Sequence, residues 1–522
     1  MNSLNFDNRT VKELPKDPKD SPHTRPVLGA FWSAVKPKPV TSPELVAHAS
    51  EVAELLGLTP EETGQADFID IFSGNRLAHG MEPYASCYGG HQFGRWAGQL
   101  GDGRAIGLGE VVNRAGERWE LQLKGSGLTP YSRGGDGLAV LRSSIREFLC
   151  SEAMHHLGIA TTRALSVITT GEPVTRDMFY DGHPRHEPGA VVCRVSPSFI
   201  RFGHFEIFAK RGENKLLEQL VDFTISRDFP ELAHIESTSE RRQIWFTQVC
   251  ERTARLMVEW LRVGFVHGVM NTDNMSILGL TIDYGPYGWI DHFDANWTPN
   301  TTDSEEHRYA YGRQPEIARW NLERLAEALS PLMESSALNA GLTRYDALYF
   351  EQFQIMLATK FGWGSWQKSD SELVERAFAL LHNAEVDMTD FFRRLATVDI
   401  ASADIDTLRP AFYREELFQR YRVPFSQWLA SYSQRVNQGF FGKNGLSRRQ
   451  SMDQVNPRFV LRNYIAQQAI ERSQEGDHQL VRELLEVLKT PYDHQPEHAH
   501  WYGIRPEWAR NKPGCSMLSC SS

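Results

Sequence analysis

The sequence predicts an α+β protein with two lobes, a small amino-terminal lobe that contains β-strands and a large helical carboxy-terminal lobe. The chain has 522 residues, whereas single hydrophobic cores rarely grow beyond about 250 to 300 residues. From residue 88 onward, glycine-rich stretches alternate with short β-rich runs. After about residue 205, apolar residues recur with helical spacing instead. These observations predict at least two cores of different secondary structure.

Residues 1–84 are predicted to form an arm and a helix that pack on the body of the protein. Proline and charged residues dominate residues 1–40, which favours an extended chain. A short helix is expected over residues 42–56.

The amino-terminal lobe is assigned to residues 85–205. A helix is expected over residues 143–157, because Ile145 and Leu149 belong to an apolar stripe that Ser143 and Ser144 could cap. Strands are predicted at the β-rich runs, residues 105–112, 118–124, 164–169 and 190–195.

The helical carboxy-terminal lobe is assigned to residues 206–490. A buried helix is predicted over residues 243–263, and it leads directly into a loop that begins at His267. A short strand is expected at residues 275–280, and helical periodicity dominates residues 315–488. Residues 491–522 are assigned to a carboxy-terminal tail.

The composition excludes several classes of function. The net charge of -10 argues against a general binder of nucleic acids or anionic membranes, so a phosphate site would need a local group of Lys and Arg. No apolar run is long enough to span a bilayer, and the polar amino terminus does not look like a targeting signal. Six cysteines are too few for a disulfide framework. A cytoplasmic monomer without nucleic-acid or membrane partners is expected.

The segment from His267 to Gly285, HGVMNTDNMSILGLTIDYG, predicts a metal site. Asn274 and Asp283 offer the oxygen ligands that a divalent ion uses when it binds nucleotide phosphates. Protein kinases take the same two ligand types from a catalytic-loop Asn and from an Asp in an Asp-Phe-Gly turn. Two unrelated polar turns would be the interpretation if this segment stood alone.

A glycine-rich turn, a strand lysine and a helix glutamate precede that segment in kinase order. The turn QLGDGRAIGLGE allows backbone N–H groups to approach phosphates closely, and Arg104 adds donors. Lys124 lies on an apolar strand, where it needs a carboxylate or phosphate partner, and Glu147 on the next helix is the natural carboxylate. The alternative is a structural hairpin and two unrelated surface residues.

A second basic group could clamp a polyphosphate. Arg194 and Arg201 each stand beside apolar residues that would draw them inward, which favours bidentate phosphate contacts over solvent exposure. Asp136 and Gly137 in SRGGDG could contact the sugar or base, although an ordinary loop turn would explain them too.

Several long stretches resemble the selenoprotein O family, also called the YdiU family, in a cysteine-containing bacterial form. They are YGGHQFG, QLGDGRA, LQLKGSGLTPYSRGGDGLAVLRSSIREFLCSEAM, HGVMNTDNMSI and the terminal SCSS, and the resemblance extends from about residue 25 to residue 522. It implies a bilobal protein-kinase-like (pseudokinase) fold. It also implies protein adenylyltransferase activity, in which ATP is bound end for end relative to kinases and AMP is transferred to Ser, Thr or Tyr hydroxyls of protein substrates.

The resemblance also implies roles for individual residues. Asn274 and Asp283 would hold Mg²⁺ or Mn²⁺, and Asp273 would be the general base. Contacts with the nucleotide would come from Gly101, Gly103, Arg104, Lys124, Asp136, Gly137, Arg194, Arg201 and Asp283.

The catalytic loop departs from the kinase pattern. Counting back from Asn274, the kinase His falls at His267, but Val269 occupies the position of the kinase base. Asp273 is the remaining carboxylate beside the metal-binding Asn, which fits an altered nucleotide pose.

The carboxy-terminal tail, KPGCSMLSCSS, could carry a redox function, because the thiols of Cys515 and Cys520 are expected to reach solvent or another sulfur. Members of this family often have selenocysteine near the end, and Cys520 takes that place here, after Ser519. Cys520 could bond Cys515 or a target thiol, or it could be an unstructured free thiol. The nearby histidines are expected to be loop residues rather than metal ligands, because no cysteines accompany them: His494, His498 and His500.

Three alternatives to AMP transfer remain. Phosphoryl transfer is disfavoured by the missing kinase base. Transfer of UMP from UTP would use the same chemistry. An inert, nucleotide-binding pseudokinase scaffold is disfavoured by the presence of both metal ligands and of the Lys124 and Glu147 pair.

Overall fold

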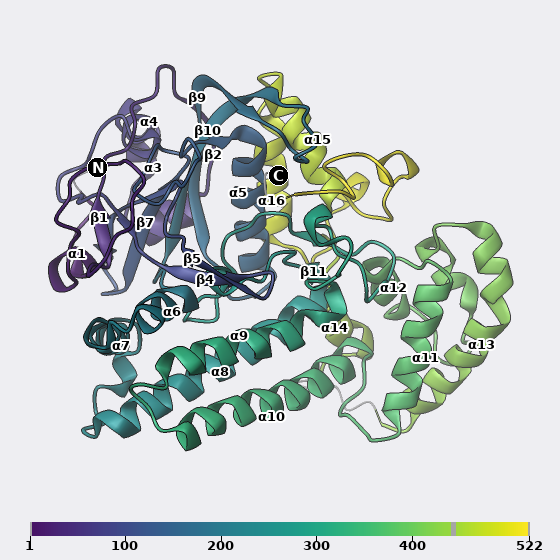
Figure 1. Ribbon diagram of the computed structural model, residues 1–522. Coiled ribbons are helices and arrows are strands. Elements are labelled where there is room, and N and C mark those ends of the chain that lie inside the picture. The colour runs from purple at the N-terminus through teal and green to yellow at the C-terminus, as the bar shows by residue number, and fades with distance from the viewer. Residues whose placement is uncertain (1–2, 440–444, 520–522) are drawn as a thin grey trace.

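Residues 3–439 and 445–519 are described by the computed structural model, which combines one large sheet with many helices (Figure 1). Within these residues, eight antiparallel strands form the sheet in the order β1-β3-β6-β7-β10-β9-β2, and β8 pairs with β10. The strands are β1 (Trp32–Ala34), β2 (Glu44–His48), β3 (Tyr84–Ser86), β6 (Ala105–Val112), β7 (Arg118–Lys124), β8 (Ala139–Val140), β9 (Arg163–Arg176) and β10 (Arg185–Ser196). The predicted mixture of α and β structure is confirmed.

The register of the central strands puts polar side chains on one face of the sheet. Leu121 and Leu123 of β7 point into the hydrophobic core. Because side chains alternate along a strand, Gln122 and Lys124 project from the opposite face. Gln122 pairs directly with Arg194 of β10, and Lys124 pairs with Val192. Lys124 and Arg194 are thereby brought to the same side of the sheet.

Helix α5 (Leu141–His156) packs against β9 and β10. The predicted helix is present, but the predicted serine caps are wrong. The helix follows strand β8 directly and starts at Leu141, so Val140 is the N-cap residue. Ser143 Oγ instead donates to Val140 O at 3.1 Å.

The amino-terminal arm contributes to the sheet through β1 and carries the short helix α1 (Arg9–Glu13). The helix predicted over residues 42–56 is only partly correct, because residues 44–48 form β2 and α2 covers Ser50–Leu55. The open edge of β9 provides backbone hydrogen-bond partners for β2, and this tertiary effect overrides the local periodicity. Two further helices follow, α3 (Pro60–Thr63) and α4 (Ala66–Ser73).

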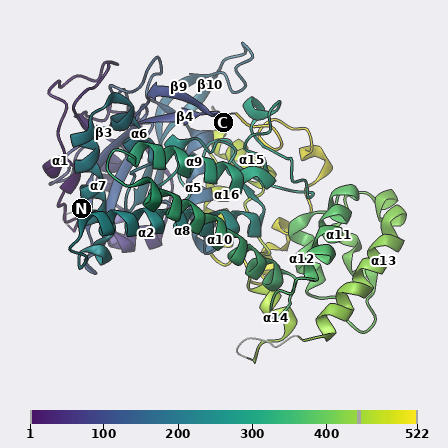
Figure 2. The same cartoon turned by 60° about the horizontal axis from the view of Figure 1, so that its bottom comes forward.

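The helices after the sheet form two groups. Figure 2 shows α8, α9 and α10 side by side, and Figure 1 shows them below the sheet. The first group comprises α6 (Phe202–Arg211), α7 (Asn214–Asp228), α8 (Thr238–Val263), α9 (Gln314–Leu329) and α10 (Ser335–Lys360). The second group has its own hydrophobic core and comprises α11 (Asp370–Asn383), α12 (Met388–Leu395), α13 (Glu415–Asn437) and α14 (Arg448–Asp453). In the part of the chain that the structure describes, no helix has the length and apolarity needed to cross a bilayer.

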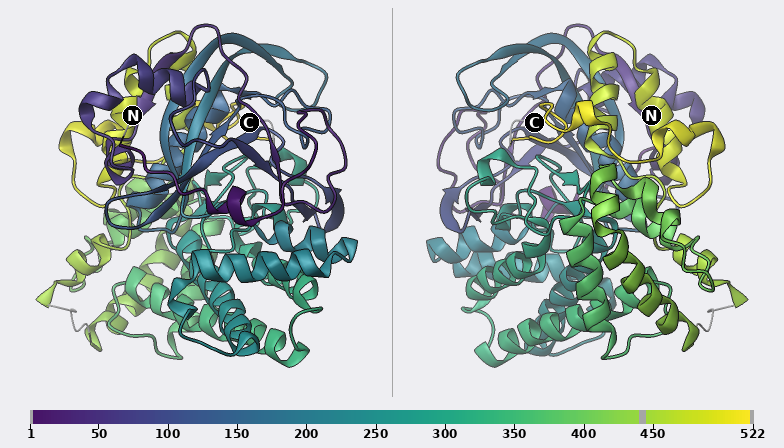
Figure 3. Two further views of the ribbon diagram at one scale, coloured as in Figure 1. Left: turned by 90° about the vertical axis from the view of Figure 1, so that its left-hand side faces the viewer. Right: turned by 90° about the vertical axis from the view of Figure 1, so that its right-hand side faces the viewer.

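The last two helices return to the sheet. Both α15 (Asn463–Gln474) and α16 (Gln479–Lys489) contact α5, and Figure 3 shows this segment in yellow against the sheet-bearing part. Arg482 of α16 donates to Val46 O of β2 at 2.9 Å. The structure therefore differs from the predicted helical lobe over residues 206–490, because a late segment completes the packing of the amino-terminal part.

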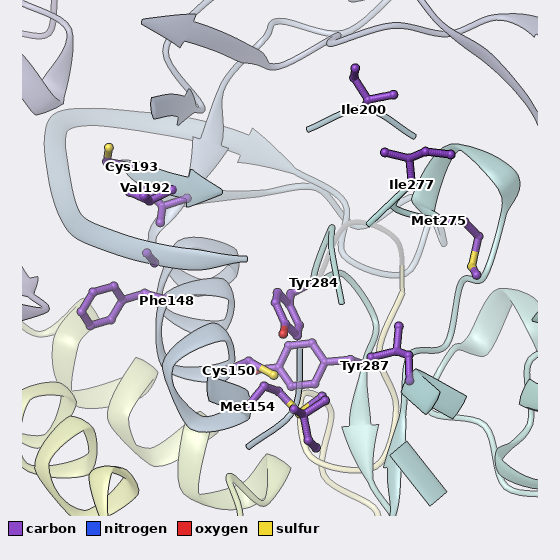
Figure 4. Close-up of a cluster of buried hydrophobic side chains, with 14 of the residues drawn as sticks. Phe148, Cys150, Met154, Val192, Cys193, Ile200, Met275, Ile277, Tyr284 and Tyr287 are labelled. Carbon is purple, nitrogen blue, oxygen red and sulfur yellow. The ribbon is translucent and has the colours of Figure 1, made fainter. Parts of the chain in front are cut away.

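The strand predicted at residues 275–280 is wrong. Ser276 forms an isolated bridge with Arg201, and the strands that pair nearby are β11 (Phe265–Val266) and β12 (Gly288–Trp289). Apolar residues of this segment are instead anchored by packing, as Figure 4 shows for Met275 and Ile277, which share a core with Tyr284 and with residues of α5. Tyr287 fixes the far end, since its hydroxyl donates to Arg146 O of α5 at 2.8 Å.

Candidate active site

A cavity of about 840 Å³ brings distant parts of the sequence together. Its walls come from the glycine-rich turn before β6, from β7 and β10, from residues 131–138, and from the segment 269–286. Of the residues predicted from the sequence, those lining it are Gly101, Gly103, Arg104, Lys124, Asp136, Gly137, Arg194, Arg201, Asp273, Asn274 and Asp283.

Glu147 lies behind the cavity wall and joins two of its cations. Its carboxylate forms an ion pair with Lys124 Nζ and accepts a hydrogen bond from Arg194 Nη1 at 3.0 Å. All three side chains are buried. Burial lowers the pKa of Lys124 to about 8, against the opposing effect of Glu147. The lysine and arginine are therefore fixed on one carboxylate and face the cavity together.

Asp283 forms ion pairs with two arginines of the cavity wall. Its two carboxylate oxygens accept from Arg194 Nη1 at 2.5 Å and from Arg201 Nε at 2.9 Å. Burial acts to raise the pKa of Asp283, but the charges of Arg201, Arg194 and Lys124 hold it well below its usual range. The carboxylate is thus ionised throughout the physiological range. Its backbone has a φ of 58°, an uncommon conformation that often marks functional residues.

The glycine-rich turn packs on the loop that follows β7. Gly101 has a φ of 80°, and a Cβ atom there would lie 2.3 Å from the ring of Tyr131. The hydroxyl of Ser132 donates to Gly103 O at 2.5 Å. The glycines thus allow the two loops to approach closely. The sequence analysis did not predict that Tyr131 would pack against this turn and line the cavity. Asp136 lies near the cavity edge, half exposed, where Arg176 donates to both of its oxygens at 2.7 and 2.8 Å.

Asp273 lies in the short 3₁₀ helix η2 (Thr272–Asn274) and is almost fully buried. Its Oδ2 accepts a hydrogen bond from Gln92 Nε2 at 3.1 Å, and its buried Oδ1 has no hydrogen-bond partner among the residues that the structure describes. Burial raises the pKa of Asp273 to about 7, although the Gln92 hydrogen bond acts to lower it. A carboxylate with a pKa near neutrality is suited to accept a proton.

A hairpin that the sequence analysis left without a role covers Asp273. It consists of β4 (Gly89–Gln92) and β5 (Arg95–Gln99). His91 N donates to Thr272 Oγ1 at 2.7 Å, and Phe93 N donates to Asn271 Oδ1 at 3.1 Å. A Cβ atom on Gly90 would lie 2.8 Å from Asp273 Oδ1, so only glycine allows this approach. In the sequence, the glycine pair and the glutamine of YGGHQFG could have indicated that this hairpin contributes to the site.

The residues predicted to hold a metal fit a hard divalent ion. Asn274 Nδ2 donates to Val269 O at 2.8 Å, so the side-chain oxygen is the group left for a ligand. Asp283 supplies an ionised carboxylate in the same cavity. An amide oxygen and a carboxylate, completed by phosphate and water, are the donors that Mg²⁺ and Mn²⁺ prefer.

The tail does not behave as predicted at Cys515. This thiol is buried rather than free to reach solvent, and burial raises its pKa to about 11. The cause is a return of the chain to the body, where Leu518 N donates to Pro299 O at 3.0 Å. Cys520, and with it the predicted bond to Cys515, lies outside the described residues. The tail histidines lie at or near the short helix η7 (Pro496–Trp501), as expected of loop residues: His494, His498 and His500.

Comparisons with known proteins give one consistent result. A family model described as "Protein adenylyltransferase SelO" matches residues 20–489. The chain is 60% identical over 524 residues to a protein named "Protein nucleotidyltransferase YdiU" from Tolumonas auensis, with all of both chains covered. Proteins of the same name from Methylobacillus flagellatus and Xanthomonas campestris pv. campestris are 59% and 55% identical, and 99% and 100% of this chain is covered.

Proposed function

Because the chain belongs to the SelO (YdiU) family of protein nucleotidyltransferases, we propose that it transfers AMP from ATP to Ser, Thr or Tyr hydroxyls of protein substrates and releases pyrophosphate. The observation that carries the proposal is one cavity lined by a buried cationic cluster, an ionised Asp283 and Asp273. The order of glycine-rich turn, Lys124, Glu147, Asn274 and Asp283 supports a kinase-like arrangement of the two parts that form it.

The cations are proposed to bind the triphosphate. Lys124, Arg194 and Arg201 are buried in the cavity wall, where the low dielectric strengthens their attraction for phosphate oxygens. Asp283 accepts from both arginines. When nucleotide and metal bind, the arginines would give up part of this contact for phosphate oxygens, and Asp283 would become a metal ligand. A Mg²⁺ or Mn²⁺ ion held by Asn274 and Asp283 would neutralise charge on the phosphates.

Asp273 is proposed to act as the general base. The substrate hydroxyl oxygen forms a bond to the α-phosphorus as the bond from that phosphorus to the bridging oxygen breaks, and pyrophosphate leaves. The hydroxyl proton passes to the carboxylate of Asp273, which lines the cavity. Val269, at the kinase base position, lines the same cavity and cannot accept a proton.

Labelled nucleotides test the proposed reaction. ATP labelled at the α-phosphate is expected to label protein, whereas ATP labelled at the γ-phosphate is expected to release labelled pyrophosphate and leave protein unlabelled. Label transferred from the γ position alone would establish phosphoryl transfer instead, and no transfer to protein in a lysate from either position would favour an inert scaffold. α-Labelled UTP in a parallel reaction measures the preference for AMP over UMP.

Gln92→Leu is expected to raise the pH needed for activity. The hydrogen bond from Gln92 lowers the pKa of Asp273 from the value that burial alone would give. A hydrogen bond to a charged group contributes about 1.5 to 3 kcal/mol, so its loss should move the midpoint of the pH profile of kcat/KM upward by about one unit or more. Gln243→Leu, an exposed glutamine on α8, is the matched control. An unchanged midpoint in Gln92→Leu would contradict the assigned base.

A further inference from the structure

Three metal-ligating side chains converge away from the cavity described above. Glu51 lies on α2, and His155 and His156 are the last two residues of α5. One ligand atom from each lies within 4.8 Å of the other two. In the residues that the structure describes, this is the one such group of three His, Cys, Asp or Glu side chains.

One pair of atoms in this group has the spacing of two ligands in a coordination shell. Ligand atoms at about 2.1 Å from a tetrahedral zinc ion lie about 3.4 Å from one another. His156 Nε2 and Glu51 Oε2 are 3.4 Å apart. The same nitrogen makes no hydrogen bond to any described residue, and the His156 side chain is only 13% exposed. A buried ring nitrogen without a hydrogen bond is unusual and needs an explanation.

The charged side chains beside the group include Glu51, Glu152 and Arg163. A neutral imidazole ring can offer one nitrogen lone pair to a metal ion. Arg163 Nη2 lies 3.7 Å from Glu51 Oε2, but Arg163 already forms hydrogen bonds to both oxygens of Glu152, at 2.6 and 2.8 Å. The carboxylates of Glu51 and Glu152 therefore share one guanidinium.

We propose that Glu51, His155 and His156 form a binding site for a first-row divalent metal ion of the zinc class. Two imidazoles and one carboxylate suit Zn²⁺ or Co²⁺ better than Mg²⁺, which prefers oxygen donors. A fourth position can be filled by water from the cavity of about 880 Å³ that Glu51 lines. The ion would join α2 to the end of α5, so binding would stabilise the contact between these two helices.

Metal titration of the full-length protein tests the site. With excess Mg²⁺ present to occupy oxygen-ligand sites, Co²⁺ is expected to give visible absorption bands and Zn²⁺ is expected to raise the Tm. Glu51→Gln and His155→Gln are each expected to weaken binding at this site by at least about tenfold, the lower bound seen even for groups beyond the coordination shell. Both side chains are exposed, so neither variant should disturb folding, which circular dichroism checks.

Two controls separate this site from other ligands. His234→Gln removes an exposed histidine elsewhere and should leave binding unchanged. A double variant, His498→Gln and His500→Gln, removes the two rings near Glu483. It should likewise leave metal binding at the proposed site unchanged. Zn²⁺ affinity and Tm shift that are the same in wild type, Glu51→Gln and His155→Gln would overturn the proposal. So would wild-type protein that binds neither Zn²⁺ nor Co²⁺.

Discussion

Asp273→Asn is expected to reduce the rate of AMP transfer about 10²- to 10⁴-fold, the usual contribution of a general base. Asparagine keeps the volume and can still accept from Gln92, but its amide cannot take the hydroxyl proton. Because burial raises the pKa of Asp273 to about 7, the wild-type rate should also rise with pH through a midpoint near neutrality. Transfer from α-labelled ATP, measured from well below to well above neutral pH, checks both expectations.

Stability measurements show whether Asp273→Asn acts through chemistry or through misfolding. The folded-state pKa of Asp273 lies above the unfolded value of about 3.9, so the folded state binds more protons between these two pKa values. Wild-type protein should therefore lose stability relative to Asp273→Asn as the pH rises from about 4 to about 7. Asp346→Asn, which removes a half-exposed carboxylate on α10, serves as the control. An active Asp273→Asn enzyme with wild-type pH dependence would exclude Asp273 as the base.

Asp283→Ala is expected to lower both activity and stability. Loss of the proposed metal ligand should remove several kcal/mol of transition-state stabilisation, which corresponds to a rate decrease of about 10³-fold or more. Arg194 and Arg201 would also lose the carboxylate that pairs with them in the buried wall. Breaking such a pair costs roughly 3 to 5 kcal/mol, and Arg194 keeps Glu147, which favours the lower end. Transfer rates across a Mg²⁺ and Mn²⁺ titration and urea unfolding measure the two effects.

Asp283→Asn separates the two effects of the alanine substitution. Asparagine tolerates the positive φ of this position, whereas alanine adds backbone strain there. The asparagine variant should therefore be better folded than Asp283→Ala, yet need much more metal for transfer. Asp222→Asn, half-exposed on α7 and paired with Arg242, controls for the loss of an ion pair. Wild-type metal dependence in Asp283→Asn would rule out this residue as a metal ligand.

Much of the cavity lining could be predicted because its functional residues occur in short, recognisable stretches of sequence. A lysine on an apolar strand requires a partner, and Glu147 is that partner in the structure. Likewise, the glycines indicate a tight turn, and the side chains of Asn274 and Asp283 supply oxygen ligands. The structure brings these segments to one cavity.

Other features could not be predicted, because they arise from contacts between residues far apart in the chain. Gln92 is 181 residues from Asp273, so no local pattern links the hairpin to the carboxylate whose pKa it adjusts. Residues 44–48 form a strand because the edge of β9 is available to pair with them. The same holds for α15 and α16, whose amphipathic pattern specifies burial but not the surface that buries them.

The sequence by itself therefore determined the α+β class, the donor types of the cavity and the family of the protein, since these depend on residue identity and near-neighbour periodicity. Only the tertiary structure decided which side chains share a low-dielectric environment. That environment raises the pKa of Asp273 and, with two arginines, lowers that of Asp283. Desolvation and Coulomb interactions act through space rather than along the chain, so identical residue types acquire opposite properties according to how the chain folds around them.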